Sequence, residues 1–133
     1  MTDAQAHNDL MRRLKGIRHI VINVCYGGFE LSHEAQLLYL TRSGVEYTLA
    51  DQESRDETER LGQRILVNND QWPGSDYIPR DDPILVSMVR ELGDKANGRY
   101  AKLKIVEIPA DVSWTINDYD GNEWIAEVHR RWR

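Results

Sequence analysis

The chain has 133 residues, of which 41% are hydrophobic and 29% are charged, and its formal net charge is -5. This length and composition predict a single globular domain over residues 1–133 with its own hydrophobic core, and they exclude a chain that is disordered throughout. The excess of acidic residues argues against a duplex-DNA-binding protein, because the affinity of such proteins depends on many phosphate contacts.

Membrane, disulfide and metal signals are missing from the sequence. The apolar runs are only a few residues long, so we expect neither a transmembrane helix nor a membrane partner. Residues 1–9 have neither a basic start nor an apolar centre, and we therefore expect no secretory signal. The single cysteine, Cys25, favours a reducing cytoplasm. The four histidines show no metal-ligand spacing, so we expect no metal and no cofactor.

The first structural element is predicted near the N-terminus. Residues 17–25 are rich in β-branched side chains and bounded by glycines, which is typical of a buried strand. Gly27 and Gly28 then predict a tight turn, because glycine adopts positive φ without steric cost. Ser32 is a favourable N-cap and predicts a helix over 33–42.

The segment 48–76 is the least regular part of the sequence. Residues 53–64 have helical propensity and alternating charge but few apolar anchors, so any helix there would be exposed. Residues 68–76 are mostly turn-forming types, which predicts a loop. We therefore expect 48–76 to be a variable and mobile segment of the one domain.

A second helix is predicted over 83–96. Asp82 is an N-cap followed by proline at the first helical position, where the missing N–H costs nothing. Apolar residues then recur at helical spacing, at Leu85, Met88, Val89 and Leu92.

The C-terminal third changes to the alternation of strands. Two alternating runs follow each other between 102 and 119, and a third follows the Asp120-Gly121 dipeptide, a strong hairpin-turn signal. We expect these strands to form a meander over 102–129. With the strand at 17–25, they predict an α+β fold in which two helices cover one face of a twisted, antiparallel-rich sheet.

Several residues are candidates for chemistry, each with a structural alternative. The turn at Gly27 and Gly28 can offer backbone N–H groups to an anion, or can serve only as a turn. Arg80 can bind an anion or pair with an acidic residue. Cys25 can act as a nucleophile beside a histidine or simply fill space. The hairpin carboxylates can perform acid–base chemistry or favour the turn; they are Asp118, Asp120 and Glu123.

A set of motifs in this order resembles a family of small uncharacterised proteins encoded by tailed phages, prophages and some large DNA viruses. The motifs are Asn23-x-Cys25-Tyr26-Gly27-Gly28-Phe29-x-Leu31-Ser32, Arg80-x-Asp82-Pro83, Glu91-Leu92-Gly93, the run Lys102-Leu103-Lys104-Ile105-Val106-Glu107-Ile108-Pro109, and Asp118-Tyr119-Asp120-Gly121. The resemblance covers residues 18–132 except 48–76. It implies an accessory viral protein in the cytoplasm of an infected bacterial host, and it brings no catalytic residue.

From these observations we expect a binding protein, a homodimer or larger, that sequesters an anionic, nucleotide-derived signal of host defence without turning it over. Tyr119 or Trp124 would stack on a base. A protein–protein inhibitor of a host factor and a hydrolase acting on the same class of ligand are the alternatives. The residues predicted to bind the ligand are Asn23, Tyr26, Gly27, Gly28, Arg80, Asp82, Tyr119 and Trp124.

Overall fold

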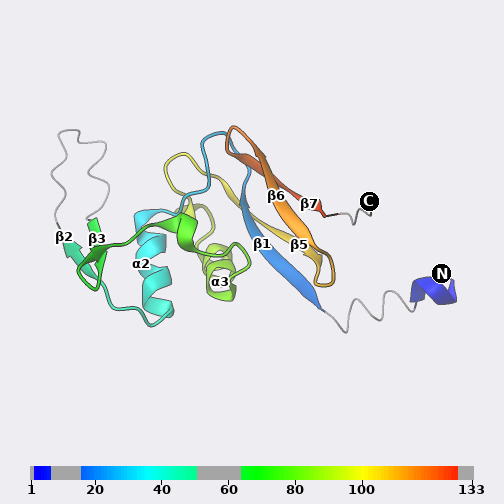
Figure 1. The fold of residues 1–133 in the computed structure, drawn as a ribbon, viewed down its shortest axis with the longest axis horizontal. Coiled ribbons are helices and arrows are strands. Elements are labelled where there is room, and N and C mark those ends of the chain that lie inside the picture. Colours follow the sequence, from blue (N-terminus) through cyan, green and yellow to red (C-terminus); the bar gives the residue numbers. More distant parts are fainter. Residues whose placement is uncertain (1, 7–15, 51–63, 129–133) are drawn as a thin grey trace, which may run out of the picture.

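The computed structural model describes residues 2–6, 16–50 and 64–128 and has the expected α+β fold (Figure 1). Helices α2 and α3 lie beside a group of long antiparallel strands, and a small separate sheet lies beyond α2 (Figure 1). In the part of the chain that is described, no helix has the length and apolar character needed to cross a membrane.

The strand predicted at the N-terminus is β1 (Ile17–Asn23), which pairs antiparallel with β5 (Leu103–Pro109) along its whole length. Ile20, Val21 and Ile22 are all buried, so β1 is covered on both faces, as its β-branched composition indicates. The strand ends at Asn23, two residues before the predicted end, because the Asn23 side chain holds the backbone that follows.

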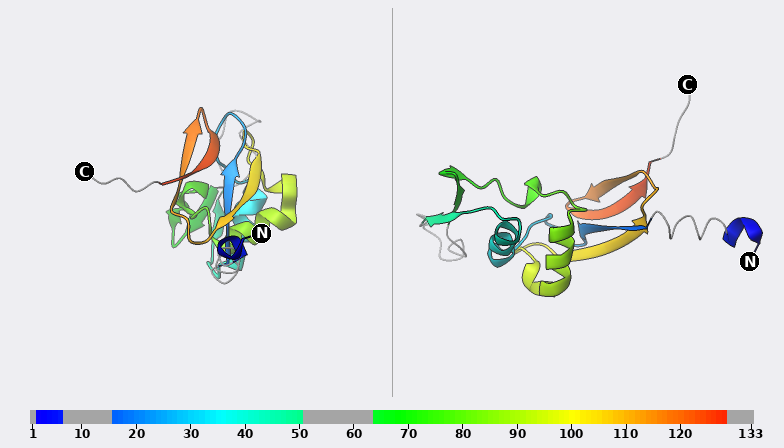
Figure 2. Two further views of the ribbon diagram at one scale, coloured as in Figure 1. Left: turned by 90° about the vertical axis from the view of Figure 1, so that its right-hand side faces the viewer. Right: turned by 90° about the horizontal axis from the view of Figure 1, so that it is seen from below.

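The C-terminal strands differ from the prediction in how they pair. β6 (Trp114–Tyr119) and β7 (Asn122–Glu127) form a hairpin, and its turn residues Asp120 and Gly121 both have positive φ, as the Asp-Gly signal predicts. The expected continuous meander is wrong, because β5 pairs with β1 while β6 and β7 pair only with each other in the described chain. The hairpin lies on the side of β1 away from α3 (Figure 2).

Both predicted helices are confirmed. Helix α2 (His33–Arg42) begins at its N-cap Ser32, whose hydroxyl accepts a hydrogen bond from the Ala35 N–H. Helix α3 (Pro83–Leu92) is capped by Asp82, and the chain continues to residue 96 as the 3-10 helix η3 (Gly93–Ala96).

Residues 48–76 contain more regular structure than expected. β2 (Thr48–Ala50), β3 (Arg64–Val67) and β4 (Asp70–Gln71) form a small antiparallel sheet, and a 3-10 helix, η2 (Ser75–Tyr77), follows it. The predicted loop over 68–76 is therefore partly wrong, because Asn68 and Asn69 adopt the positive φ of a tight hairpin turn. The stretch 53–64, which has helical propensity, falls outside the described residues, except that Arg64 begins β3.

The main core lies between the two helices and the β1–β5 ladder. Leu85 and Met88 of α3 and Ala35 of α2 are fully buried there against Val21 of β1. Burial of the leucine, methionine and valine side chains stabilises the fold by about 1.5–3 kcal/mol each. This packing sets the position of the loop that follows β1, which contains the candidate residues.

Candidate functional site

Three segments that are distant in sequence meet beyond the end of β1. They are the diglycine corner (residues 25–28), the segment that precedes α3, and the β6–β7 turn. The Gly27 N–H donates to the Asp120 carbonyl at 3.1 Å, and Arg80 contacts Glu123 of β7. The structure therefore brings Asn23, Gly27, Gly28 and Arg80 together with the hairpin.

The Asn23 side chain joins the diglycine corner, the β6–β7 turn and the residue before β5. Its Nδ2 donates to the Cys25 carbonyl at 2.8 Å and to the Gly121 carbonyl at 2.7 Å. Its Oδ1 accepts a hydrogen bond from the Lys102 N–H at 2.8 Å. The residue is fully buried, and its amide group is used within the protein.

The positive charge of Arg80 is compensated by a carboxylate. Its Nη1 and Nη2 bind the two oxygens of Glu123 at 2.7 and 2.9 Å, and Nη1 also reaches the Val21 carbonyl at 3.2 Å. The Phe29 ring covers the guanidinium, with its centroid 3.5 Å from Cζ. Of the two roles considered for Arg80 in the sequence, the structure shows the pairing with an acidic residue of the protein.

Arg80 and Glu123 also bind backbone N–H groups of β1 on the edge that does not pair with β5. The Val21 N–H donates to the Arg80 carbonyl at 2.9 Å, and the Asn23 N–H donates to Glu123 Oε1 at 2.7 Å. These contacts satisfy backbone groups that a neighbouring strand would otherwise bind. They explain why the β6–β7 hairpin can lie beside β1 without continuous pairing.

The glycines of the junction are required by close backbone packing. A Cβ on Gly27 would lie 2.4 Å from the Tyr100 carbonyl oxygen, and a Cβ on Gly121 would lie 2.6 Å from the Gly28 nitrogen. Both distances are shorter than any real Cβ contact. The diglycine corner therefore packs against the hairpin turn, and its Gly27 N–H is bound there.

Asp82 acts as a helix cap and as an acceptor for α2. Its Oδ1 accepts from the N–H groups of Ile84 and Leu85, and its Oδ2 accepts from the Tyr39 hydroxyl at 2.8 Å. Burial, together with this hydrogen bond to Asp82, raises the pKa of Tyr39 above its ordinary value of 10.0. Asp82 thus joins the two helices.

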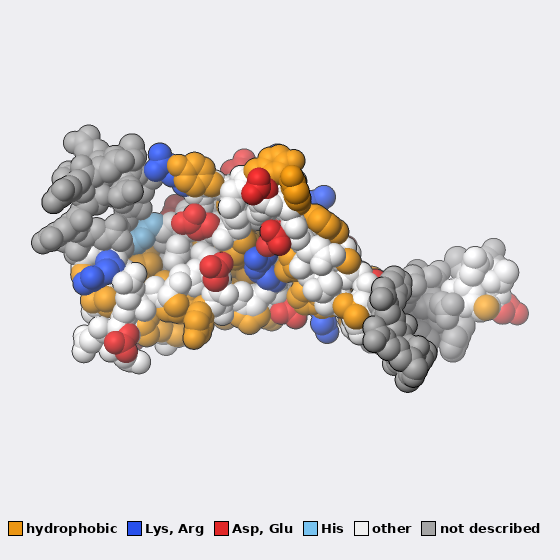
Figure 3. All heavy atoms as spheres, turned by 45° about the horizontal axis from the view of Figure 1, so that its top comes forward, with side chains coloured by type: hydrophobic (Ala, Val, Ile, Leu, Met, Phe, Trp, Pro, Cys, Tyr) orange, Lys and Arg blue, Asp and Glu red, His pale blue; other side chains and the backbone are white. Residues whose placement is uncertain are grey.

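The aromatic residues of the hairpin lie on its outer face. Tyr119 and Trp124 are diagonal neighbours across β6 and β7, with exposed fractions of 70% and 49%. Glu123 occupies the opposite face and points to Arg80. Tyr26 of the diglycine corner is also exposed. Figure 3 shows hydrophobic and acidic side chains interspersed on this part of the surface.

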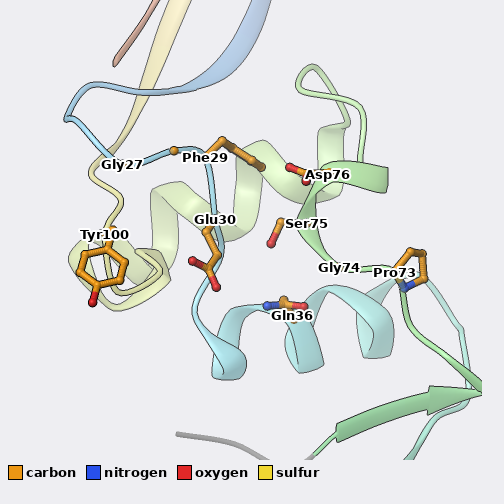
Figure 4. A pocket seen from close by; sticks show the side chains of 10 residues that line it. Gly27, Phe29, Glu30, Gln36, Pro73, Gly74, Ser75, Asp76 and Tyr100 are labelled. Atoms are coloured by element: carbon orange, nitrogen blue, oxygen red, sulfur yellow. The ribbon is translucent and has the colours of Figure 1, made fainter. Parts of the chain in front are cut away.

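An open cleft of about 390 Å³ lies beside the diglycine corner. Tyr100 and Glu30 stand on one side of it, Ser75 and Asp76 on the other, and Gln36 of α2 lies below them (Figure 4). Of the predicted ligand-binding residues, the cleft lining includes only Gly27 and Gly28, described above. The other lining residues come from loops, from η2 and from the surface of α2, where the sequence shows no periodic signal.

Some polar side chains of the cleft are hydrogen-bonded within the protein, and others are exposed carboxylates. The Ser75 hydroxyl accepts from the Leu31 N–H at 2.9 Å, and the Gln36 amide binds the Leu31 carbonyl and the Trp72 indole N–H. Glu30 and Asp76 are exposed, so their carboxylates can accept hydrogen bonds from a ligand. The described residues that line the cleft include no lysine or arginine.

Asp118 and Glu123 are register partners across β6 and β7, but both carboxylates and the Cys25 thiol are bound by other groups of the protein. Asp118 accepts a hydrogen bond from the Gly121 N–H within the turn, while Glu123 binds Arg80. The Cys25 thiol donates to the Tyr100 carbonyl at 3.2 Å. Within residues 2–6, 16–50 and 64–128, no group of three His, Cys, Asp or Glu side chains could hold a metal ion.

Comparison with models of known families, with curated proteins and with solved structures gave no match to this chain.

Proposed function

We propose that this protein is a non-catalytic binding protein that captures a small nucleotide-derived molecule. The observation that carries the proposal is the cleft of about 390 Å³ beside the diglycine corner. Ligand pockets in proteins commonly have volumes of about 300–1,000 Å³, and a mononucleotide is small enough for this range. Residues 25–28 are fixed beside the cleft by hydrogen bonds from the Asn23 side chain to the Cys25 carbonyl and from the Gly27 N–H to the Asp120 carbonyl.

The chemistry of the lining favours the nucleoside part of such a ligand. Tyr100, with an exposed fraction of 62%, offers an aromatic face for stacking on a base. Glu30 and Asp76 offer acceptors for ribose hydroxyl and base amino groups. Because these carboxylates repel anions, we expect the phosphates of the ligand to point to solvent. This differs from the earlier expectation that Arg80 meets the negative charge.

The biological setting is part of the same proposal and rests on the motifs in the sequence. Following their resemblance to the viral family, we place the protein in the cytoplasm of an infected bacterial host. There it would act as a homodimer or larger assembly and sequester a signal of host defence. Sequestration requires one binding site for each captured molecule and no catalytic residues. In this proposal the cleft is that binding site.

Native mass spectrometry of the protein purified from infected cells tests the proposal. We expect a retained small molecule, returned intact after denaturation, which separates capture from hydrolysis. In parallel, the chemical shifts of backbone amides can be followed while AMP, cyclic dinucleotides and ADP-ribose are added. Shifts at Gly28, Glu30 and Asp76 that saturate would support the proposal.

The variant Tyr100→Ala should weaken this binding by about tenfold, because loss of one stacked base costs about 1–3 kcal/mol. Tyr77→Ala is the matched control, since Tyr77 is similarly exposed and is not part of the cleft lining. Absence of a retained molecule, together with no saturable shift from any of the three ligand types, would overturn the proposal.

A second candidate function, inhibition of a host protein, is favoured by the outer face of the hairpin. Exposed Trp and Tyr side chains are the residue types that dominate binding energy at protein interfaces. Trp124→Ala should then abolish recovery of a stoichiometric host protein in a pull-down from lysate, while Tyr100→Ala should leave it unchanged. Equal recovery with the wild type and with Trp124→Ala would exclude this surface as the binding site.

A further inference from the structure

We propose that a second groove, at the opposite end of β1 from the diglycine corner, binds a small oxyanion of the phosphate or diphosphate class. The groove has a volume of about 350 Å³ and lies between the first residues of β1 and one face of α3. It shares no lining residue with the cleft described above, so it is a separate site that does not depend on the proposed function.

Two arginines line this groove, and among the described residues neither has a carboxylate partner. Arg18 comes from β1 and Arg90 from α3. By contrast, Arg42 and Arg80 each bind a carboxylate, of Glu91 and Glu123 respectively. Two guanidinium groups thus line one groove in a protein whose net charge is -5. Their planar N–H groups match the oxygens of phosphate.

Neutral groups of the groove complete the site. Ser87 lies one turn before Arg90 on α3, and its exposed hydroxyl can donate to an anion. The N-terminus of α3 adds little, because Asp82 already accepts from the Ile84 and Leu85 N–H groups. Recognition would therefore depend on the side chains of the groove.

Acidic groups near the groove set its selectivity. Asp81 is the carboxylate in the lining, and His19 binds Glu107 at 3.2 Å across the β1–β5 ladder. The lining therefore carries two guanidinium groups against one carboxylate. Because Asp81 opposes a second negative charge, we expect the groove to hold a compact anion with its charge directed to the arginines.

A titration of the full chain with inorganic pyrophosphate at low ionic strength tests this proposal. We expect saturable chemical-shift changes at the backbone amides of Arg18, Ser87 and Arg90. Arg90→Gln and Arg18→Gln should each weaken binding by about tenfold, since each removes charge-assisted hydrogen bonds to the anion. Asp81→Asn should strengthen binding by removing a repulsive charge.

Arg64→Gln is the matched control, because it removes the same charge from an exposed position in β3 and should leave the affinity unchanged. An equal loss in Arg64→Gln and Arg90→Gln would show a general charge effect and would overturn the proposal. The absence of saturable shifts in the groove would also overturn it. A second titration with ADP separates the two sites, since changes confined to Gly28, Glu30 and Asp76 would assign binding to the cleft alone.

Discussion

Arg80 and Glu123 form a bidentate ion pair where β1, the β6–β7 hairpin and the segment before α3 meet. The two N–O distances are 2.7 and 2.9 Å. Each partner also binds the backbone of β1. The side chains have exposed fractions of 19% and 10%, so solvent screens their interaction only weakly.

Removing Glu123 should therefore destabilise the protein strongly. Glu123→Ala leaves the mostly buried Arg80 guanidinium without its counter-charge, and loss of one partner of a buried pair costs about 3–5 kcal/mol. Urea unfolding monitored by Trp fluorescence measures this change. Glu107→Ala is the control, because Glu107 is exposed and its contact with His19 should contribute at most about 1 kcal/mol. Equal effects of the two substitutions would contradict the structural role of the pair.

Asn23→Asp should destabilise the junction without changing its volume. The substitution replaces an NH2 group, which donates to the Cys25 and Gly121 carbonyls, with an oxygen that repels both of them. Each unsatisfied buried group costs about 1–3 kcal/mol, so we expect a loss of roughly 2–6 kcal/mol in the free energy of unfolding. Asn117→Asp on the exposed side of β6 tests the same chemistry without burial and should have little effect. A small effect at both positions would argue against this network.

Gly121→Ala should cost more than Gly44→Ala. Both glycines have positive φ, at 87° and 74°, so alanine is strained at either position by about 1–2 kcal/mol. Only at Gly121 does the added Cβ also meet backbone, 2.6 Å from the Gly28 nitrogen. The difference in unfolding free energy between Gly121→Ala and Gly44→Ala therefore measures the cost of the steric clash between the hairpin turn and the diglycine corner. Equal losses would mean that the two loops do not pack this closely.

Because of Tyr39, the free energy of unfolding should decrease as the pH rises in the alkaline range. Its pKa is raised in the folded protein, so folding favours the protonated phenol. This contribution is fully present below the unfolded pKa near 10.0 and is lost as the pH rises through the folded value. Tyr39→Phe should be less stable at neutral pH by about 1 kcal/mol, through loss of the hydrogen bond to Asp82.

The stability difference between the wild type and Tyr39→Phe should narrow as the pH rises above about 10. Urea unfolding at a series of alkaline pH values measures it. Tyr77→Phe, at an exposed position, should show no such convergence. A constant difference between wild type and Tyr39→Phe would contradict the effect of burial on this hydroxyl.

Sequence reasoning located the elements whose signals are local. Ser32 and Asp82 mark helix starts because a cap binds N–H groups two or three residues away. Asp120-Gly121 marks the hairpin for the same reason, since the turn depends on two adjacent residues with positive φ. Arg80 and Asn23 were also selected from the sequence, but as ligand-binding residues, because a polar residue near a turn has the same local pattern whether its partner is a ligand or the protein.

The sequence by itself therefore determined the α+β class, both helices, the strand after residue 16 and the final hairpin. Only the tertiary structure decided that β5 pairs with β1, that Arg80 is neutralised by Glu123, and that a cleft opens beside Gly27 and Gly28. The physical reason is the range of the interactions involved. The Asn23 N–H meets a carboxylate 100 residues away, and such a contact depends on how whole elements pack, which the conformational preferences of neighbouring residues do not specify.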